Sequence, residues 1–516
     1  METRRTVQPF IKAALIIAVS LMVLPYLVGA FSGGNTHTFL GFLFNPKDGL
    51  SYLAKMEQGR QGSWLFRLPY TAGPVNGVFL FSFYLFLGHL TRWTGLPAVW
   101  VFHASRVGAS LFLLYSLWKF AGLYFPDERK QTLAFLLLVF GSGMGWVLFV
   151  TGYLPADFWV AEMYPFFAML SNPHFPLGMG LMLQMILLAQ KTGKRSVLVL
   201  LGLAGLGLSI VLPFGYVSVV IPLAVDWVLE AFFQKDARKG IPLLALIPGG
   251  GCLLFQYWQV VSDPFLRQWN AQNITPTPVW WDVFLSLSPA IVLIIVGLAS
   301  GMRNFGKNPQ RLVWLWVISA LLLAYTPISI QRRFLSGFYI PVAILGLEGL
   351  VWLFEKYQWP IRRGFGLLFG LSIPTHLLLI VVGLFGALSV SPKLYLSTGE
   401  TEAMEWIVAH TPQEAVFASS EEIGLVIPAL TGRRVILGHP FETPDYESVA
   451  EVVEGVFTAD QSPESLEAFS QQYGASYFFW GPREQKMAGE GADPSQMGEL
   501  VFENEEVKII AAGLTP

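Results

Sequence analysis

Charged residues are scarce in this sequence. Asp, Glu, Lys and Arg make up 13% of its 516 residues, whereas 53% are hydrophobic and the mean hydropathy is +0.53. Soluble domains carry about 25% charged residues, so the composition excludes a wholly soluble chain. Apolar runs of about 20 residues, each long enough to cross a hydrocarbon core of roughly 30 Å, recur along most of the length. The composition therefore predicts a polytopic α-helical membrane protein.

Cysteine is almost absent as well. Cys252 is the only one and lies within an apolar run, which excludes an intrachain disulfide and a cysteine-rich metal site. The C-terminal part contains neither a G-x-G-x-x-G motif nor a P-loop, so it carries no nucleotide-binding signature. We expect membrane lipids around the chain and no nucleic-acid partner.

Acidic and basic residues are distributed unevenly along the chain. Of the 35 acidic and 33 basic residues, 21 and five respectively lie between Leu396 and Pro516, so this tail has a net charge of −16 and the preceding part +14. We predict a basic membrane domain at 1–394 and a small soluble domain at 395–516.

Eleven apolar segments are predicted to span the membrane. They lie at 10–31, 97–121, 131–150, 174–190, 196–212, 213–233, 240–261, 281–301, 311–329, 336–354 and 365–390. A further segment at 76–91 would extend only about 24 Å as a helix, which is short for a crossing.

The distribution of basic residues decides the status of 76–91. If this segment does not cross, the basic N-terminus and five short basic loops, including 303–311, all face the cytoplasm, as the positive-inside rule requires. We therefore predict an interfacial or re-entrant helix within a long outer loop at 32–96. The predicted topology is that of a multi-pass protein of the plasma membrane, with a retained N-terminal signal anchor, a cytoplasmic N-terminus and an extracytoplasmic tail.

The tail has the pattern of a small α/β domain. Short apolar runs at 415–420, 433–438 and 476–481 are bounded by Gly, Pro or Ser, as buried strands are. Helical patterns at 421–431, 446–457 and 463–473 separate them. This alternation predicts βαβ units in a small layered sheet.

Polar residues gather in the stretch "NPKDGLSYLAKMEQG" at 45–59, inside the first outer loop. A helix over 47–60 would place Asp48, Tyr52 and Lys55 on one face, with Glu57 nearby. One interpretation is a solvated amphipathic helix, whose dipole favours Asp48 near its N-terminus. The other is a catalytic surface at the membrane boundary.

The order of these residues resembles the GT-C superfamily of membrane glycosyltransferases. The likeness is closest to a bacterial branch that includes the aminoarabinose transferase and relatives of the protein O-mannosyltransferases. It covers the layout of residues 1–390 and rests on the set Pro46, Asp48, Tyr52, Gly62, Trp64, Pro74 and Arg106.

The resemblance implies a chemistry for Asp48. In that superfamily an Asp of the first outer loop is the general base for an acceptor hydroxyl, and the donor is a sugar carried on a polyprenyl phosphate. Attack at the anomeric carbon inverts its configuration and releases the lipid phosphate. The phosphate needs positive charge beside it rather than a general acid.

Candidates for that positive charge lie at the outer end of the ninth predicted span. Arg332 and Arg333 depart from the positive-inside bias, and Arg suits bidentate phosphate binding. The resemblance also implies a Tyr at this turn, which Tyr339 matches. Anchoring to lipid headgroups is the alternative. Arg106, within the second span, either orients the first outer loop or ties backbone carbonyls.

The sequence departs from the superfamily pattern in two places. The start of the fourth span has "SNPHF" in place of an acidic residue, which leaves His174 or Glu162 as the candidate for that role or for a divalent metal. The spacing of these residues is not typical of metal ligands. The segment "TAGPVNG" at 71–77 lacks the charged residues of the aminoarabinose transferase, so that donor is not supported.

The tail has a polar group of its own, which has two interpretations. It could form a binding face for an acceptor or glycan at the ends of the strands. The interpretation that the sequence favours is turn chemistry, with Thr443 or Asp445 capping the next helix. Its members are Arg433, Arg434, His439, Glu442 and Asp445.

The sequence as a whole predicts an inverting glycosyltransferase. It would move a sugar from a polyprenyl-phosphate donor to a hydroxyl of an envelope glycan, lipid or protein on the outer side of the membrane, with Asp48 as the base. Two alternatives stay open: a non-catalytic protein with the same fold, and a transporter or flippase of lipid-linked sugars. A transporter would be expected to bury charges at mid-membrane, and few charges lie at the centres of the predicted spans.

Overall fold

The computed structural model describes residues 2–191, 193–304, 309–458, 462–489 and 494–512. Residues 305–308 of the predicted basic loop at 303–311 lie outside this set. The contacts divide the chain into two compact units. Unit 1 comprises Met1–Pro25, His103–Phe255 and Thr275–Gly383, and unit 2 comprises Tyr26–Phe102, Gln256–Ile274 and Leu384–Pro516.

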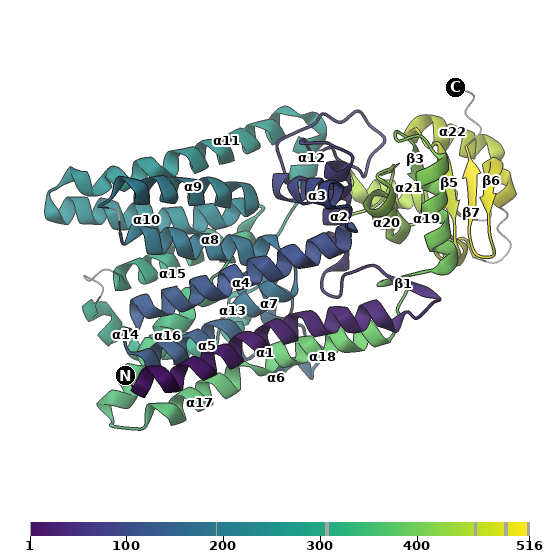
Figure 1. Cartoon of the computed structure of the whole chain (residues 1–516). Coiled ribbons are helices and arrows are strands. Elements are labelled where there is room, and N and C mark those ends of the chain that lie inside the picture. Colours follow the sequence, from purple (N-terminus) through teal and green to yellow (C-terminus); the bar gives the residue numbers. More distant parts are fainter. Residues whose placement is uncertain (1, 192, 305–308, 459–461, 490–493, 513–516) are drawn as a thin grey trace. The chain divides into compact units, whose positions relative to one another are not determined.

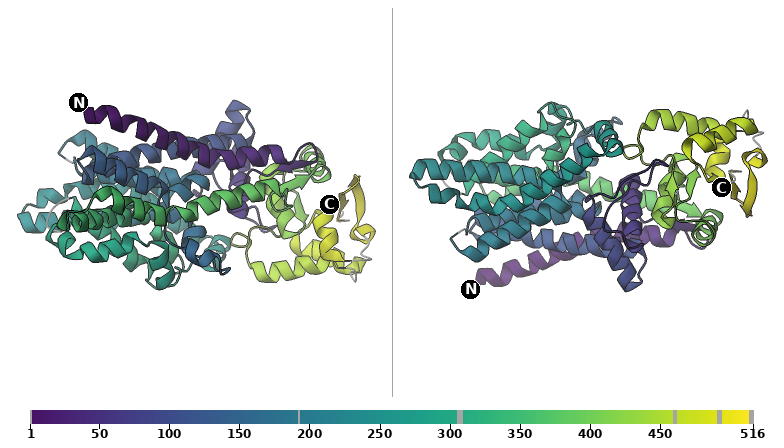
Figure 2. Two further views of the ribbon diagram at one scale, coloured as in Figure 1. Left: turned by 90° about the horizontal axis from the view of Figure 1, so that it is seen from below. Right: turned by 90° about the horizontal axis from the view of Figure 1, so that it is seen from above.

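Unit 1 is built from helices that run alongside one another in all three views (Figures 1 and 2). The helices that lie wholly or largely in it are α1 (Glu2–Ser32), α4 (Ala98–Tyr124), α5 (Glu128–Phe140), α6 (Trp146–Phe149), η1 (Ala156–Phe158), η2 (Ala161–Met163), α7 (Pro165–Leu170), α8 (His174–Ala189), α9 (Arg195–Val211), α10 (Pro213–Gln234), η3 (Ala237–Leu246), α11 (Ile247–Ser262), α13 (Trp280–Ser286), α14 (Ala290–Asn304), α15 (Gln310–Ala324), η4 (Gln331–Leu335), α16 (Tyr339–Lys356), α17 (Ile361–Ser372) and α18 (Pro374–Leu388).

Several of these helices can cross a bilayer. Within the described residues, five segments are long and apolar enough: Pro9–Ser32, Ala98–Tyr124, Pro213–Gln234, Gly240–Ser262 and Ile361–Leu388. A sixth is counted if the bent pair α13 and α14 is one span. The predicted spans at 174–190, 196–212 and 311–329 are shorter apolar helices, so the total of eleven stays a prediction.

Two predicted spans are interrupted. The segment expected at 281–301 is two helices, α13 and α14, bent by 96°. Pro289 precedes α14 and has no backbone N–H to continue the helical hydrogen bonds of α13. The segment expected at 131–150 ends as α5 at Phe140, because the chain then lies against another backbone: a Cβ at Gly143 would be only 1.9 Å from the carbonyl oxygen of Ser286.

Unit 2 contains the predicted α/β region. Its elements are β1 (His37–Phe39), α2 (Pro46–Arg60), α3 (Ser82–Thr94), α12 (Pro264–Gln272), β2 (Tyr395–Ser397), α19 (Thr398–His410), β3 (Val416–Ala418), α20 (Glu421–Thr431), β4 (Arg434–Val435), α21 (Tyr446–Val456), α22 (Pro463–Tyr473), β5 (Tyr477–Trp480), α23 (Pro482–Ala488), η5 (Pro494–Met497), β6 (Glu499–Glu503) and β7 (Lys508–Ala511). Helix α3, in place of the segment 76–91, has 13 residues and is too short to cross a bilayer.

The sheet of unit 2 has the order β4-β3-β5-β7-β6. The first three strands are parallel, as the predicted βαβ units require, and β7 and β6 add an antiparallel hairpin at the other edge. Alternate residues of β3 point to opposite faces of the sheet. Phe417 packs with α19 and α20 on one face, whereas Val416 and Ala418 pack with α21 and α22 on the other.

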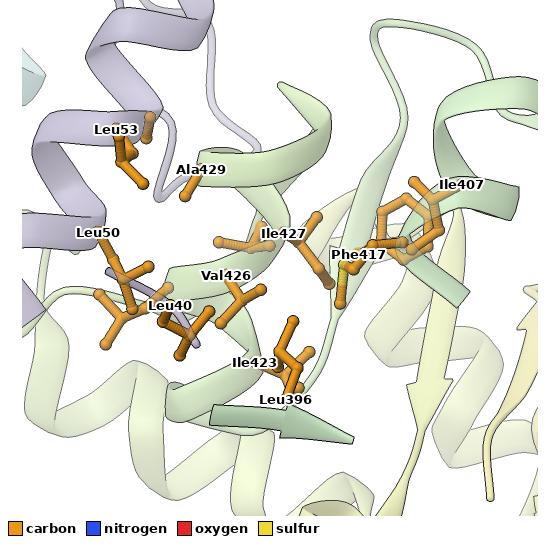
Figure 3. Packing of buried hydrophobic residues seen from close by; sticks show 14 of the residues in the cluster. Leu40, Leu50, Leu53, Leu396, Ile407, Phe417, Ile423, Val426, Ile427 and Ala429 are labelled. Carbon is orange, nitrogen blue, oxygen red and sulfur yellow. The ribbon is translucent and has the colours of Figure 1, made fainter. Parts of the chain in front are cut away.

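Helix α2 of the first outer loop packs onto the first of these faces. Leu50 and Leu53 lie against Val426 and Ala429 of α20, as Figure 3 shows, and all four are at most 4% exposed. Burying a Leu side chain contributes about 1.5–3 kcal/mol. The apolar side of α2 therefore fixes the direction in which its polar side chains point.

Candidate functional site

Asp48 lies in the first turn of α2. Asn45 precedes the helix in a left-handed conformation with φ 51°, and Pro46 is one of the first helical residues. The Asp48 carboxylate is held at both oxygens: Nδ2 of Asn45 donates to Oδ2, and Nε2 of His439 lies 2.8 Å from Oδ1. The Asp48 side chain is nevertheless 33% exposed. Its carboxylate is thus both anchored and accessible to a substrate.

Lys55 lies two turns further along the same face and is fully buried. Its Nζ is 2.8 Å and 3.0 Å from the two carboxylate oxygens of Glu442 and 2.5 Å from Oγ of Ser51. The ammonium group also lies 4.2 Å from the ring centroid of Phe81, within range of a cation–π interaction. The hydrogen bonds and the aromatic ring compensate part of the cost of burying this charge.

The Lys55–Glu442 pair is a charged pair in an apolar setting. Burial lowers the pKa of Lys55, and the Glu442 carboxylate opposes that effect. Burial alone would raise the pKa of Glu442, but Lys55, His439 and Ser51 together hold it below its ordinary value. Glu442 therefore stays ionised beside Lys55.

The remaining polar residues of α2 have structural partners. The ring of Tyr52 stacks on Tyr84 with centroids 4.1 Å apart. Glu57 is buried and accepts two hydrogen bonds of 2.6 Å from Arg60. The interpretation of α2 as a solvated amphipathic helix is wrong, because Lys55 and Glu57 on its polar side are buried and paired.

The polar group of the tail divides into two parts. His439 and Glu442 point to α2, as described above. The guanidinium of Arg433 donates instead to the carbonyls of Val408, Thr411 and Thr431, and Arg434 donates to the carbonyls of Ala72 and Gly73. Arg433 thus ties the C-terminal ends of α19 and α20 together, and Arg434 holds the loop at 72–73, so both have structural partners.

The predicted cap of α21 is also wrong. Asp445 occupies the N-cap position with φ 54°, and its side chain makes no capping hydrogen bond. The hydroxyl of Thr443 accepts from the backbone N–H of Gly438 instead, 3.1 Å away. Thr443 therefore shapes the turn that carries His439 and Glu442.

In unit 1, Arg332 and Arg333 lie in the short helix η4. Nε of Arg332 is 3.3 Å from Oε1 of Glu162, and its guanidinium lies 4.9 Å from the ring centroid of Trp159. The guanidinium of Arg333 lies over Phe214 at 5.2 Å, and its Nε has no hydrogen-bond partner among the described residues. Of the two arginines, Arg332 thus has a carboxylate partner, whereas the contact described for the guanidinium of Arg333 is an aromatic ring.

Two further predicted residues of unit 1 are packed in its interior. The ring of Tyr339 is fully buried, 5.2 Å from that of Tyr164. Arg106 is 1% exposed and donates to the carbonyls of Met22 and Met169 at 3.1 and 2.7 Å. These contacts agree with the interpretation of Arg106 as a tie between backbone carbonyls.

The candidate metal ligands do not form a cluster. His174 is the first residue of α8 and packs against Phe175, with ring centroids 4.0 Å apart, whereas Glu162 contacts Arg332. Among the residues that the structure describes, no group of three or more His, Cys, Asp or Glu side chains is arranged to hold a metal ion.

The fold is found in solved membrane glycosyltransferases. The oligosaccharyltransferase of Archaeoglobus fulgidus in its apo form matches with a TM-score of 0.57 and 13% identity, over 91% of this chain and 69% of that one. The oligosaccharyltransferase AglB of Archaeoglobus fulgidus, in complex with an inhibitory peptide and a dolichol-phosphate, matches with a TM-score of 0.50 and 13% identity, over 92% of this chain and 69% of that one. ArnT of Cupriavidus metallidurans bound to undecaprenyl phosphate matches at 0.53 and 12%, over 96% and 97%.

Sequence comparison adds nothing to this likeness. No protein-family model matches the chain, and no curated protein matches it. The predicted resemblance to the GT-C superfamily is confirmed by the fold. The predicted fold class, a polytopic helical protein with a small C-terminal α/β region, is confirmed as well.

Proposed function

We propose that this protein with the GT-C fold transfers a sugar from a polyprenyl-phosphate donor to a hydroxyl group, with Asp48 as the general base. The reaction would take place at the outer side of the plasma membrane, on an envelope glycan, a lipid or a protein. Support comes from the shared fold and from two similar structures that contain dolichol-phosphate and undecaprenyl phosphate.

The reaction needs one carboxylate. The acceptor oxygen forms a bond to the anomeric carbon, the bond from that carbon to the phosphate oxygen breaks, and the configuration inverts. The acceptor proton passes to the carboxylate of Asp48, and the polyprenyl phosphate leaves as an anion. A positioned base of this kind contributes a factor of about 10²–10⁴ to the rate.

The main observation in favour of Asp48 as the base is that its side chain is both held by hydrogen bonds and partly exposed. Asn45 and His439 each occupy one oxygen, so the side chain has a fixed direction. Each carboxylate oxygen has a second lone pair, and a third of the side chain is exposed. An acceptor hydroxyl can therefore reach a carboxylate that is already oriented, which lowers the entropic cost of the reaction.

Arg332 and Arg333 are the proposed partners of the donor phosphate. Arginine binds phosphate oxygens through two parallel hydrogen bonds, and it remains charged at any pH a protein tolerates. The buried Nε of Arg333 has no partner among the residues that the structure describes, which supports this role more than the geometry of Arg332, which already contacts Glu162.

The test is the activity of Asp48→Asn in purified full-length protein. Undecaprenyl-phosphate hexoses and pentoses with labelled sugars would be offered with membrane lipids, envelope glycans and proteins as acceptors, and transfer of label measured. We expect the variant to lose at least about 100-fold in rate. Glu451→Gln, the same carboxylate-to-amide change on the exposed side of α21, should stay within about twofold.

Two outcomes would refute the proposal. One is an Asp48→Asn variant that transfers sugar at the wild-type rate. The other is wild-type protein that leaves every offered donor intact, which would favour the non-catalytic or transport alternative. Thermal unfolding of both variants shows whether a loss of rate reflects a loss of structure.

A further inference from the structure

The turn at residues 438–443 supplies both partners of the polar face of α2. His439 reaches Asp48, and Glu442 reaches Lys55. The turn is itself well fixed: the backbone N–H groups of Glu442 and Thr443 donate to the carbonyl of His439 at 2.9 and 2.8 Å. One short segment of the tail thus aligns two of its side chains with Asp48 and Lys55, which lie two turns apart on α2.

The surroundings of His439 determine which of its nitrogens carries the proton. The backbone N–H of Phe441 donates to Nδ1 at 3.2 Å, so Nδ1 acts as the acceptor and is unprotonated. In a neutral imidazole the other nitrogen then carries the hydrogen. Nε2–H of His439 therefore donates to Oδ1 of Asp48.

The imidazole has little freedom to turn away from Asp48. It is 5% exposed, and the ring of Tyr70 lies 6.4 Å from it, centroid to centroid. Tyr70 also packs so tightly on the turn that a Cβ at Gly438 would lie 2.3 Å from its ring. The Lys55–Glu442 pair fixes the far end of the turn.

From this geometry we infer that His439 is a positioning residue for Asp48, and that the C-terminal tail belongs to the catalytic machinery through it. The inference rests on the proposed function of Asp48. His439 holds one carboxylate oxygen by a single defined hydrogen bond and leaves the exposed lone pairs to the acceptor. It does not touch substrate and takes no proton during the reaction.

Two amide substitutions separate positioning from mere packing. His439→Gln places its amide nitrogen near the location of Nε2 and keeps a donor for Asp48. His439→Asn places its amide near Nδ1, where it can still accept from Phe441 but is too short to reach Asp48. We expect kcat to stay within about threefold in His439→Gln and to fall roughly 10- to 100-fold in His439→Asn, with the KM for the lipid donor unchanged.

The pH profile is the second readout. A hydrogen bond to a carboxylate favours its charged form, so loss of the donor raises the pKa of Asp48. The acid limb of kcat/KM should therefore move to higher pH in His439→Asn and much less in His439→Gln. Lys55, Tyr70 and Glu442 also face this region, and they are the same in both variants.

The tautomer can be tested without activity. In full-length protein labelled with ¹⁵N-histidine, the resonances absent from His439→Gln belong to His439. We expect a protonated Nε2 and an unprotonated Nδ1 at neutral pH. The reverse pattern would overturn the inference, even if His439→Asn fails to fold.

The kinetic outcomes distinguish this inference from the proposed function. If Asp48→Asn is inactive while His439→Asn keeps the wild-type kcat and acid limb, Asp48 remains the base and His439 is not its positioning residue. If Asp48→Asn is fully active, the proposed function fails and the inference fails with it. Equal losses in His439→Gln and His439→Asn would also contradict a role through the hydrogen bond.

Discussion

The charged side chains of α2 and of η4 are neutralised in different ways. On α2, Lys55 meets Glu442 at 2.8 Å and Asp48 meets His439 at 2.8 Å. On η4, Arg332 contacts Glu162 at the longer distance of 3.3 Å, and Nε of Arg333 has no hydrogen-bond partner among the described residues. The Lys55–Glu442 pair is thus buried and fully paired within the protein, whereas Arg333 has a hydrogen-bond donor without a partner among the described residues.

This difference separates structural charges from available ones. A fully buried pair such as Lys55–Glu442 strengthens its own attraction by excluding water, but it cannot exchange partners easily. An arginine that lies against an aromatic ring keeps hydrogen-bond donors free for a ligand. We therefore assign stability to the Lys55–Glu442 pair and propose phosphate binding for the arginines of η4, and the predictions below test both statements.

The largest effect is expected from Lys55→Met. The change leaves the Glu442 carboxylate buried without its cation, which should lower the free energy of unfolding by about 3–5 kcal/mol. Chemical unfolding of the purified protein measures this loss. The double variant Lys55→Met/Glu442→Leu removes both charges and should recover most of it.

The exposed pair Lys508–Glu503 provides the matched control. Its partners are 3.0 Å apart, with side chains 41% and 51% exposed. Lys508→Met should cost less than about 1 kcal/mol, because solvent screens such pairs. If Lys55→Met and Lys508→Met lower the free energy of unfolding by similar amounts, burial does not make the Lys55–Glu442 pair more important for stability than an exposed pair.

A smaller effect is expected from Arg333→Ala, on activity rather than on stability. A hydrogen bond to a charged group contributes about 1.5–3 kcal/mol, so kcat/KM for the lipid-phosphate donor should fall roughly 10- to 100-fold. Arg332→Ala should lose less, since Arg332 already contacts Glu162. Steady-state kinetics with varied donor concentration tests both.

Arg363→Ala is the control for the arginine series. This residue is exposed at the start of α17, and its loss should change kcat/KM by no more than about twofold. If Arg333→Ala behaves like this control, the cation on η4 does not bind the donor phosphate. The charges of η4 would then differ from the Lys55–Glu442 pair in their hydrogen bonding but not in function.

Local patterns in the sequence were sufficient for much of unit 2. The three predicted strands appear as β3, β4 and β5, and the three predicted helices as α20, α21 and α22. The hairpin of β6 and β7 was not predicted, because its apolar runs are short and that of β6 spans only the three residues between Glu499 and Glu503. The pairing of β1 with β2 joins residues too distant in sequence for a local pattern to reveal.

The candidate site was only half accessible to sequence reasoning. Periodicity placed Asp48, Tyr52 and Lys55 on one face of a helix, and α2 confirms that helix. The partners of Asp48 and Lys55 are 391 and 387 residues away, and spacing carries no information over such separations. The sheet and its connecting turns bring them together, which is why the sequence alone left His439 and Glu442 between a binding face and turn chemistry.

The smallest expected effect is the pH dependence of the stability that the Lys55–Glu442 pair contributes. The pKa of Glu442 is below its ordinary value in the folded protein, so the carboxylate contributes stability that is present above the unfolded pKa of about 4.5 and is lost as the pH falls through the lower, folded value. The difference in melting temperature between wild type and Glu442→Gln should therefore be constant near neutral pH and shrink below about pH 4.5. The acids that do not contact Glu442 titrate in both proteins, so the acid part of the difference reports on Glu442 and the groups coupled to it. A difference that persists unchanged into acid would mean that Lys55 does not stabilise the ionised form of Glu442, because protonation would then cost the wild type nothing.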